Sequence, residues 1–287
     1  MTNTPVLSGN IQAFRNLVLP VSEELFGSRF STSLSKHKQY VQEMLKLLSL
    51  NGSMTTWELA KSSIILDLDS MRSRDKVFRR LILGRTDRGK SNPGVLDIGL
   101  VTTTNSIPNS SNKYRLSAHG LLYCLAVLDL SDDEINRIVS NYSDIFPKIF
   151  AKWSLINSYF KNSIELLKKI GDTYVYENRH LTKFTSFPFV EINDYIHTKY
   201  VNFYESISES DFADEVSYWF FTNLPIEYVL TGKNTHKLLE NWTCLFEEDL
   251  DLKNWYYSFL LEMKNFYLVR FAKLDHQLSL DNNLIEG

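Results

Sequence analysis

The sequence predicts a mainly α-helical protein with one short β-ribbon in its N-terminal half. Apolar residues make up 44% of the 287 residues and recur at helical spacing through most of the chain. One run, residues 95–104, is instead rich in β-branched side chains, and strand-like alternation of useful length is missing after Leu116. We therefore expect two domains, of which the C-terminal one is all-helical.

Three helices are expected before the β-ribbon. Their spans are residues 36–51, 56–63 and 70–83. Thr55 is suited to cap the second helix at its N-terminus, because a hydroxyl can accept a hydrogen bond from a free backbone N–H there. Gly52 and Gly84 end the first and third helices, since glycine readily adopts the left-handed conformation of a helix C-terminus.

The β-ribbon follows a stretch that breaks the third helix. Residues 85–94 are rich in Gly, Asn, Asp and Pro, which predicts a loop that either adds a contact to a ligand or is a mobile basic segment. Residues 95–104, 105–112 and 114–116 are expected to form a strand, a polar loop and a returning strand. Ser117 is suited to cap a further helix over residues 118–130.

The chain divides into three expected segments. Residues 1–35 form an N-terminal arm, residues 36–130 the domain with the β-ribbon, and residues 131–287 the all-helical domain. The boundary is set by Ser131 and Glu134, whose spacing is typical of a capping box at a helix start. Five or six helices are expected after it, one of them long and covering residues 252–278. Their breaks are expected at Pro147, Gly171, Pro188, Pro225 and Gly232.

Charge is distributed unevenly along the chain. The net charge is −3 overall, but it is +6 over residues 31–130 and −9 over residues 131–287. Between Asp69 and Lys90 eight basic residues stand against three acidic ones. This pattern favours a part that binds a polyanion and a part that is kept away from it.

Two local motifs carry a resemblance to a known family. They are Thr55-Thr56-Trp57-Glu58-Leu59-Ala60 at the start of the second expected helix, and Tyr114-x-Leu116-Ser117-x-x-Gly120 at the end of the ribbon. With the order of elements, they make residues 36–130 resemble the winged helix-turn-helix domains of prokaryotic, especially archaeal, transcriptional regulators. The resemblance covers about a third of the chain. It implies that the third helix enters the major groove of double-stranded DNA and that the β-wing touches the neighbouring backbone or minor groove.

The expected DNA-binding residues follow from charge and from this resemblance. Arg72, Arg74 and Lys76 are placed to reach base edges, and Ser73, Thr55 and Thr56 to donate hydrogen bonds to phosphates. Phosphate contacts are expected from Arg79, Arg80, Arg85, Arg88 and Lys90 and, at the wing tip, Lys113. For single residues a solvated charge or a helical pair such as Asp75 with Arg79 is the alternative. Trp57, Met71 and Phe78 are expected in the core.

Catalytic patterns are missing from the sequence. The six histidines are scattered, and glycine-rich phosphate loops and nucleophile motifs are not found, so we expect a protein that is not an enzyme and needs no cofactor or metal. The two cysteines, Cys124 and Cys244, do not suggest a disulfide framework. A secretory signal and a membrane-spanning run are not apparent either, which favours a cytoplasmic location.

The aromatic C-terminal half has three interpretations. It can simply be a helical core, or it can form a homodimer interface that spaces two winged helices over a two-fold site. It can also bind a small-molecule or protein effector. The sequence as a whole favours a DNA-binding transcriptional regulator. The alternative is a protein-interaction adaptor whose winged helix docks on an acidic protein surface, and an enzyme carried by the helical half is a remote third.

Overall fold

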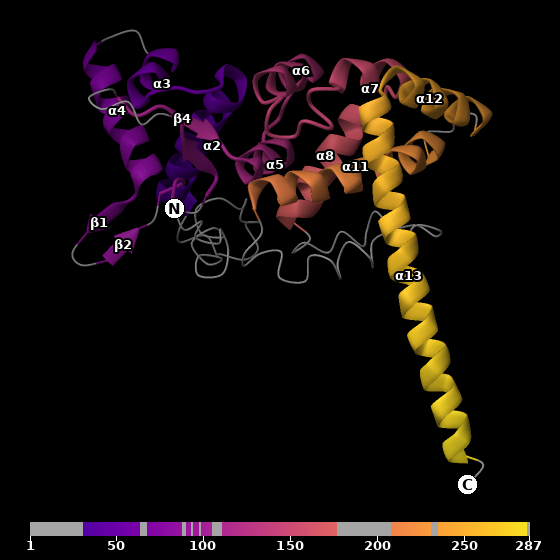
Figure 1. Ribbon diagram of the computed structural model, residues 1–287. Coiled ribbons are helices and arrows are strands. Elements are labelled where there is room, and N and C mark those ends of the chain that lie inside the picture. The colour runs from indigo at the N-terminus through magenta and orange to yellow at the C-terminus, as the bar shows by residue number, and fades with distance from the viewer. Residues whose placement is uncertain are drawn as a thin grey trace.

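The computed structural model describes residues 31–63, 68–87, 90–92, 94–97, 99–104, 111–176, 208–230 and 235–285. It is mainly helical, with two small two-stranded antiparallel sheets in the described part (Figure 1). The N-terminal elements are α2 (Ser31–Asn51), α3 (Thr56–Ser62), α4 (Leu68–Leu83), β1 (Arg85–Asp87), β2 (Lys90–Asn92), β3 (Val101–Thr103), β4 (Tyr114–Leu116) and α5 (Ala118–Val127). They are followed by α6 (Asp132–Asn141), α7 (Trp153–Tyr159), α8 (Ser163–Tyr176), α11 (Glu209–Leu230), α12 (Thr235–Glu248) and α13 (Leu250–Ile285).

The predicted helix ends are confirmed at three positions. Gly52 and Gly84, which follow α2 and α4, have φ of 73° and 74°, in the left-handed region that favours glycine. Thr55 caps α3, because its Oγ1 accepts from the Glu58 N–H at 3.1 Å while Glu58 Oε2 accepts from the Thr55 N–H at 2.7 Å. This reciprocal pair satisfies two backbone donors that a helix start leaves free.

The ribbon of β3 and β4 is joined by a third stretch of extended chain. Thr103 pairs with Tyr114 inside the ribbon, and Met54, between α2 and α3, forms a bridge to Tyr114 from the other side. Two backbone hydrogen bonds close the bridge, Met54 N–H to Tyr114 O at 2.9 Å and Tyr114 N–H to Met54 O at 2.7 Å. The α2–α3 connection is therefore fixed against β4.

The first strand of the ribbon is shorter than predicted. Residues 95–97 form a turn, because the N–H groups of Val95 and Leu96 donate to the carbonyls of Leu81 and Ile82 at the end of α4, at 2.9 and 3.1 Å. These two N–H groups thus donate to the last turn of α4 and not to a neighbouring strand. A Cβ at Gly94 would lie 2.1 Å from the Ile82 carbonyl oxygen. The chain after β2 can therefore pass this close to the end of α4 only because position 94 has no side chain.

The expected loop of residues 85–94 contains a hairpin. Strands β1 and β2 pair with Arg85 opposite Asn92 and Asp87 opposite Lys90. Because β1 begins right after Gly84, the hairpin continues from the C-terminal end of α4 (Figure 1). The prediction of an irregular loop was wrong for these strands, since local backbone pairing can form between polar residues that carry no hydrophobic alternation.

Helix α5 begins as predicted and ends earlier. Ser117 Oγ accepts from the Gly120 N–H at 3.1 Å, and the helix stops at Val127, before the predicted end at Leu130. A Cβ at Gly120 would lie 2.0 Å from the Leu100 carbonyl oxygen, so the start of α5 packs directly on the backbone that precedes β3.

The described part of the C-terminal half consists of helices joined by turns and contains no strand, and two of its predicted breaks are wrong. The capping box of Ser131 and Glu134 opens α6 as expected. Gly171 lies inside α8, where it lets this helix approach α5 closely: a Cβ there would lie 2.8 Å from the Leu122 carbonyl oxygen. Pro225 lies inside α11. The expected breaks at Pro188 and Gly232 lie outside the described residues.

One buried core extends from α2 to α13. It includes Met44 and Phe78 near the ribbon, Leu121 of α5, and Trp219 and Phe259 of the aromatic half. Helix α5 packs against α8, so the core is continuous across residue 131, and the domain boundary near it stays a prediction. Among the described residues, none of the helices is long and apolar enough to cross a membrane.

Candidate nucleic-acid interface

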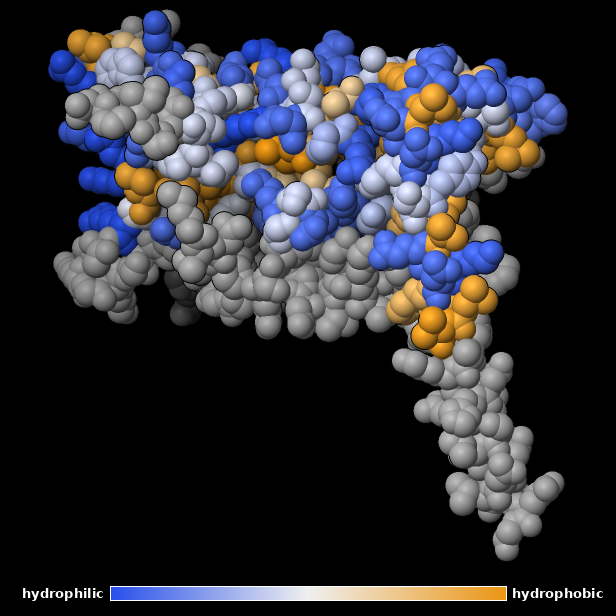
Figure 2. All heavy atoms as spheres, viewed as in Figure 1, coloured by the Kyte–Doolittle hydropathy of each residue, from blue (hydrophilic) through white to orange (hydrophobic). Residues whose placement is uncertain are grey.

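Helix α4 presents a basic face to solvent. Arg72, Lys76, Arg79 and Arg80 are all exposed. They share one side of the helix, because their spacings of 4, 3 and 1 residues place them within about a quarter of a turn around the helix axis. Ser73 is exposed at the edge of this side. We call these four basic residues the α4 basic face. Figure 2 shows hydrophilic atoms gathered along the end of the molecule where α4 lies.

Two members of the α4 basic face are already paired with acids of the same helix. Arg72 Nη1 lies 3.5 Å from Asp69 Oδ1, and Arg79 Nη2 lies 3.2 Å from Asp75 Oδ2. The second pair is the helical alternative expected from the sequence. Both arginines keep more than 60% of their side-chain surface exposed, so these ion pairs are weak and leave most of each guanidinium open to an anion.

The other two members carry uncompensated charge. In the part of the chain that the structure describes, Lys76 forms no ion pair with an acidic side chain, and the same holds for Arg80. An exposed cation without an intramolecular partner can bind a phosphate without first losing an existing contact. These two residues are therefore the most available cations of α4.

Arg74 does not belong to the α4 basic face, contrary to the prediction. Its Nη1 lies 3.3 Å from Glu43 Oε2 on α2, and its guanidinium lies 4.4 Å from the centre of the Tyr40 ring. Only 18% of the Arg74 side chain is exposed. The reason is helical phase, since Arg74 is four residues before the fully buried Phe78 and shares the side of α4 that packs on α2.

The start of α3 also differs from the prediction. Thr56 is buried, so its hydroxyl is not presented to a ligand, whereas Thr55 is half-buried and serves as the cap. Trp57 was expected in the core but 42% of it is exposed. In a helix of two turns Thr56, Leu59 and Ala60 already fill the buried side, which leaves Trp57 beside it and partly exposed.

The basic residues beyond α4 are described only in part. Arg85 is exposed at the start of β1, and the backbone of Lys90 lies in β2. Arg88, the side chain of Lys90 and the tip of the wing at residues 105–110 lie outside the described residues. The exposed part of the hairpin therefore adds Arg85 next to the C-terminal end of α4.

Lys113 is half-buried where the wing returns into β4. Its carbonyl accepts from the Thr104 N–H at 3.0 Å, which closes the described part of the wing. The hydrogen bond from the Thr55 backbone lowers the pKa of Glu58, and the charge of Lys113 lowers it further. The positive charge of Lys113 thus offsets the negative charge of Glu58 at the start of α3, so Lys113 is less available than Lys76 to bind an anion.

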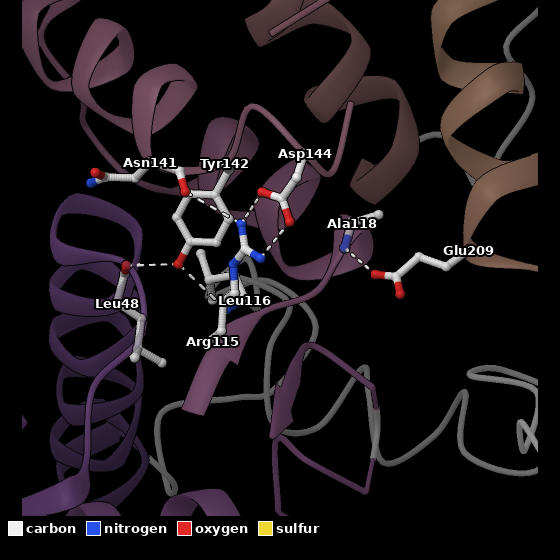
Figure 3. A network of polar contacts seen from close by, with 8 residues as sticks. All are labelled: Leu48, Arg115, Leu116, Ala118, Asn141, Tyr142, Asp144 and Glu209. Carbon is white, nitrogen blue, oxygen red and sulfur yellow. Dashed lines mark hydrogen bonds and ion pairs between the residues drawn. The ribbon is translucent and has the colours of Figure 1, made fainter. Parts of the chain in front are cut away.

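A polar network that the sequence did not reveal joins the ribbon to the helical half. Arg115 of β4 donates two hydrogen bonds to the carboxylate of Asp144, which follows α6, and a third to the carbonyl of Asn141 at 3.3 Å (Figure 3). Its guanidinium also lies over the Tyr142 ring. The hydrogen bonds from Arg115 hold the pKa of Asp144 below its usual value.

The same network reaches α2 and α11. The Tyr142 hydroxyl donates to the Leu48 carbonyl of α2 at 2.8 Å, and burial raises the pKa of this hydroxyl. Glu209, at the start of α11, accepts from the Ala118 N–H at the start of α5 at 3.3 Å (Figure 3). For Arg115 the only signal in the sequence was the alternation of side chains along β4. Tyr114 and Leu116 point into the core, which leaves Arg115 on the other side of the strand.

These contacts join the ribbon and α2 to the helical half. Among the described residues, His, Cys, Asp and Glu side chains do not gather in groups of three that could hold a metal ion. The comparisons with family models, curated proteins and solved structures give no match for this chain. The function therefore has to be argued from the geometry of α4 and its surroundings.

Proposed function

We propose that this protein is a double-stranded DNA-binding transcriptional regulator, with α4 in the major groove and the β-wing on the backbone. The observation that carries the proposal is the α4 basic face, an exposed row of cations on a helix whose opposite side is packed into the core. A major groove about 12 Å wide admits one helix, and cationic side chains on its outer side meet phosphates and base edges.

The connectivity around α4 supports the same proposal. Helix α2, the extended stretch at Met54, α3 and α4 follow one another in the order expected for a winged helix, and β3 and β4 complete this order after the additional hairpin of β1 and β2. In that arrangement the bridge between Met54 and Tyr114 supplies the outer strand of a small three-stranded ribbon. Its wing would then leave the ribbon between β3 and β4, beside the helix that contacts DNA.

The residues divide by the contacts that we propose. Arg72, in the N-terminal half of α4, and Lys76, at the middle of the helix, are placed to reach base edges. Arg79 and Arg80 contact phosphates, and Arg85 extends this contact along the hairpin. Arg74 is withdrawn from the set because its contacts with Glu43 and Tyr40 hold it against α2.

The test is duplex binding by the full chain and by the variant Arg72→Ala/Lys76→Ala/Arg79→Ala/Arg80→Ala. Fluorescence anisotropy with a mixed-sequence duplex at low salt should show binding by the natural chain and at least a tenfold weaker affinity for the variant, since four cations are lost. Circular dichroism checks that the variant stays folded. Equal affinities of the two proteins would refute the proposal.

The same experiment separates the alternative function. An adaptor that uses the α4 basic face to dock on an acidic protein would not bind the duplex at low salt. It would instead bind a polyglutamate peptide, and the fourfold variant would lose that binding. Chromatin immunoprecipitation of the natural chain would then show no enriched sites, whereas a regulator gives discrete ones.

A further inference from the structure

The exposed side of α4 carries an acid in line with its cations. Asp69 lies in the first turn of α4, and 93% of its side chain is exposed. It is three residues before Arg72 and seven before Lys76, so the three side chains leave the helix on the same side. A carboxylate on this side repels DNA phosphates. Asp69 therefore opposes binding by α4 unless it recognises a group other than a phosphate.

Arg72 is the ion-pair partner of Asp69. Its Nη1 lies 3.5 Å from Asp69 Oδ1, and 64% of the Arg72 side chain is exposed. A guanidinium has five N–H donors, so one that faces Asp69 leaves the others available to a base. A carboxylate has about four lone-pair sites and can likewise accept from a second donor. The pair thus exposes N–H donors directly beside an acceptor.

The major-groove edge of a G·C base pair has the matching order of groups. Guanine offers two acceptors, N7 and O6, and cytosine offers the N4 amino donor beside them. The hydrogen-bonded N4 and O6 atoms lie about 3 Å apart, close to the 3.5 Å between Nη1 of Arg72 and Oδ1 of Asp69. An A·T pair presents acceptor, donor and acceptor instead, so two of the three contacts would be repulsive.

We propose that Asp69 and Arg72 together read one G·C base pair, with Arg72 on guanine and Asp69 on the cytosine amino group. The inference rests on the proposed binding of DNA by α4 and adds the base pair that the N-terminal end of this helix selects. Contact with the bases removes water from both side chains, so their ion pair, weak in the free protein, becomes stronger in the complex. Asp69 thus reduces affinity for duplexes in general and adds a preference for G·C at one position.

A structural role of Asp69 acts on a different quantity. A negative charge in the first turn of a helix stabilises that helix, because it interacts favourably with the helix dipole. This effect changes the free energy of unfolding and not the choice of base pair. The ratio of affinities for two duplexes that differ at one base pair is independent of it, since the same folded protein binds both.

The test begins with a library of duplexes that have a random central segment, from which the full natural chain selects its preferred site. The site should contain a G·C pair whose change to A·T weakens binding by roughly tenfold or more. At the same position 7-deazaguanine, which lacks the N7 acceptor, should weaken binding, whereas inosine, which keeps N7 and O6, should not. Arg72→Ala should bind the guanine and 7-deazaguanine duplexes equally.

The role of Asp69 is tested by Asp69→Asn, whose amide can donate as well as accept. The preference for G·C over A·T at the selected position should fall by about fivefold or more, even if affinity for both duplexes rises. The matched control is Asp75→Asn. Asp75 also pairs with an arginine of the α4 basic face, but only 14% of its side chain is exposed, so the affinity ratio of this variant should equal that of the natural chain.

The outcomes separate this inference from the proposed function. A natural chain that binds duplexes without selecting a G·C pair would overturn the readout and leave DNA binding intact. An unchanged ratio in Asp69→Asn would do the same, as would an equal loss in Asp75→Asn, because the charge of α4 alone would then explain it. A natural chain that binds no duplex at low salt would overturn both.

Discussion

The sharpest prediction concerns Lys76 and Arg80, for which the described part of the chain provides no ion-pair partner. In Lys76→Ala/Arg80→Ala the loss of these side chains leaves no acid without its partner, because neither residue takes part in a described ion pair. Because we assign Arg80 to a phosphate and Lys76 to a base edge, the slope of log K against log salt concentration becomes less steep by about 0.9, the value for one phosphate contact. Between 50 and 200 mM salt the affinity defect of the variant then shrinks by about three- to fourfold.

The assay is fluorescence anisotropy with one labelled duplex over a salt series. The matched control is Lys161→Ala/Lys237→Ala, which removes the same charge from exposed positions of the acidic helical half. Its salt slope should equal that of the natural chain, since a distant surface charge contributes only to the overall field. Urea unfolding of both variants verifies that they have the stability of the natural chain.

The slope gives the prediction a clear way to fail. Parallel lines for the natural chain and Lys76→Ala/Arg80→Ala would mean that neither residue releases counterions from DNA, whatever the absolute affinities are. A smaller slope in the control variant as well would assign the effect to net charge. Either result would withdraw Lys76 and Arg80 from the proposed contact with DNA.

Three further predictions concern the support of this face. Arg74→Ala should lower the free energy of unfolding by about 1–2 kcal/mol in urea, because a partly buried ion pair and a ring contact are lost, while the salt slope of DNA binding stays that of the natural chain. Gly94→Ala should cost more than Gly52→Ala, since its Cβ meets the backbone of α4 at 2.1 Å, whereas at position 52 only left-handed strain of about 1–2 kcal/mol arises. Asp144→Asn should destabilise the protein at neutral pH and less so at pH 3. The hydrogen bonds from Arg115 hold the pKa of the Asp144 carboxyl in the folded protein below its value in the unfolded chain, about 3.9. The carboxylate therefore stabilises the fold above that pH, and this stabilisation is lost as the pH falls through the folded pKa.

Each of these has a control. Arg72→Ala, on the exposed side of the same helix, should leave stability nearly unchanged, and equal losses for the two arginines would contradict the inward position of Arg74. Equal costs at the two glycines would mean that the chain after β2 yields to the added methyl group. For the carboxyl, urea midpoints of the natural chain and Asp144→Asn that differ equally at both pH values would show that its charge is not the source of the stabilisation.

Local signals predicted much of the fold. The caps at Thr55, Ser117 and Ser131 and the glycine at position 84 mark helix ends, because capping depends on hydrogen bonds between residues three apart or on the φ of one residue. The same local reasoning failed where tertiary contacts decide. Gly171 looked like a helix break, yet it lies inside α8, where a close approach to α5 needs a residue without a side chain.

The candidate interface was predicted in its charge and only partly in its geometry. Residue types and spacing identified the exposed cations of α4, since helical phase follows from sequence alone. Arg74 was assigned to base edges by its residue type and its place along the helix, although its spacing of four residues from Phe78 puts it on the side of α4 that packs on α2. Sequence reasoning did not identify Arg115 as a contact residue, because its partner Asp144 is 29 residues away and comes close to it only in the folded chain.

By itself the sequence determined that this chain is mainly helical, where most of its helices start, and that residues 69–90 carry an excess of positive charge. These are properties of neighbouring residues, which fix local backbone geometry and local charge. The tertiary structure decided which cations reach solvent and that a hairpin extends α4. Such properties depend on contacts between distant segments, because burial of one face of a helix requires a partner that the local sequence does not specify.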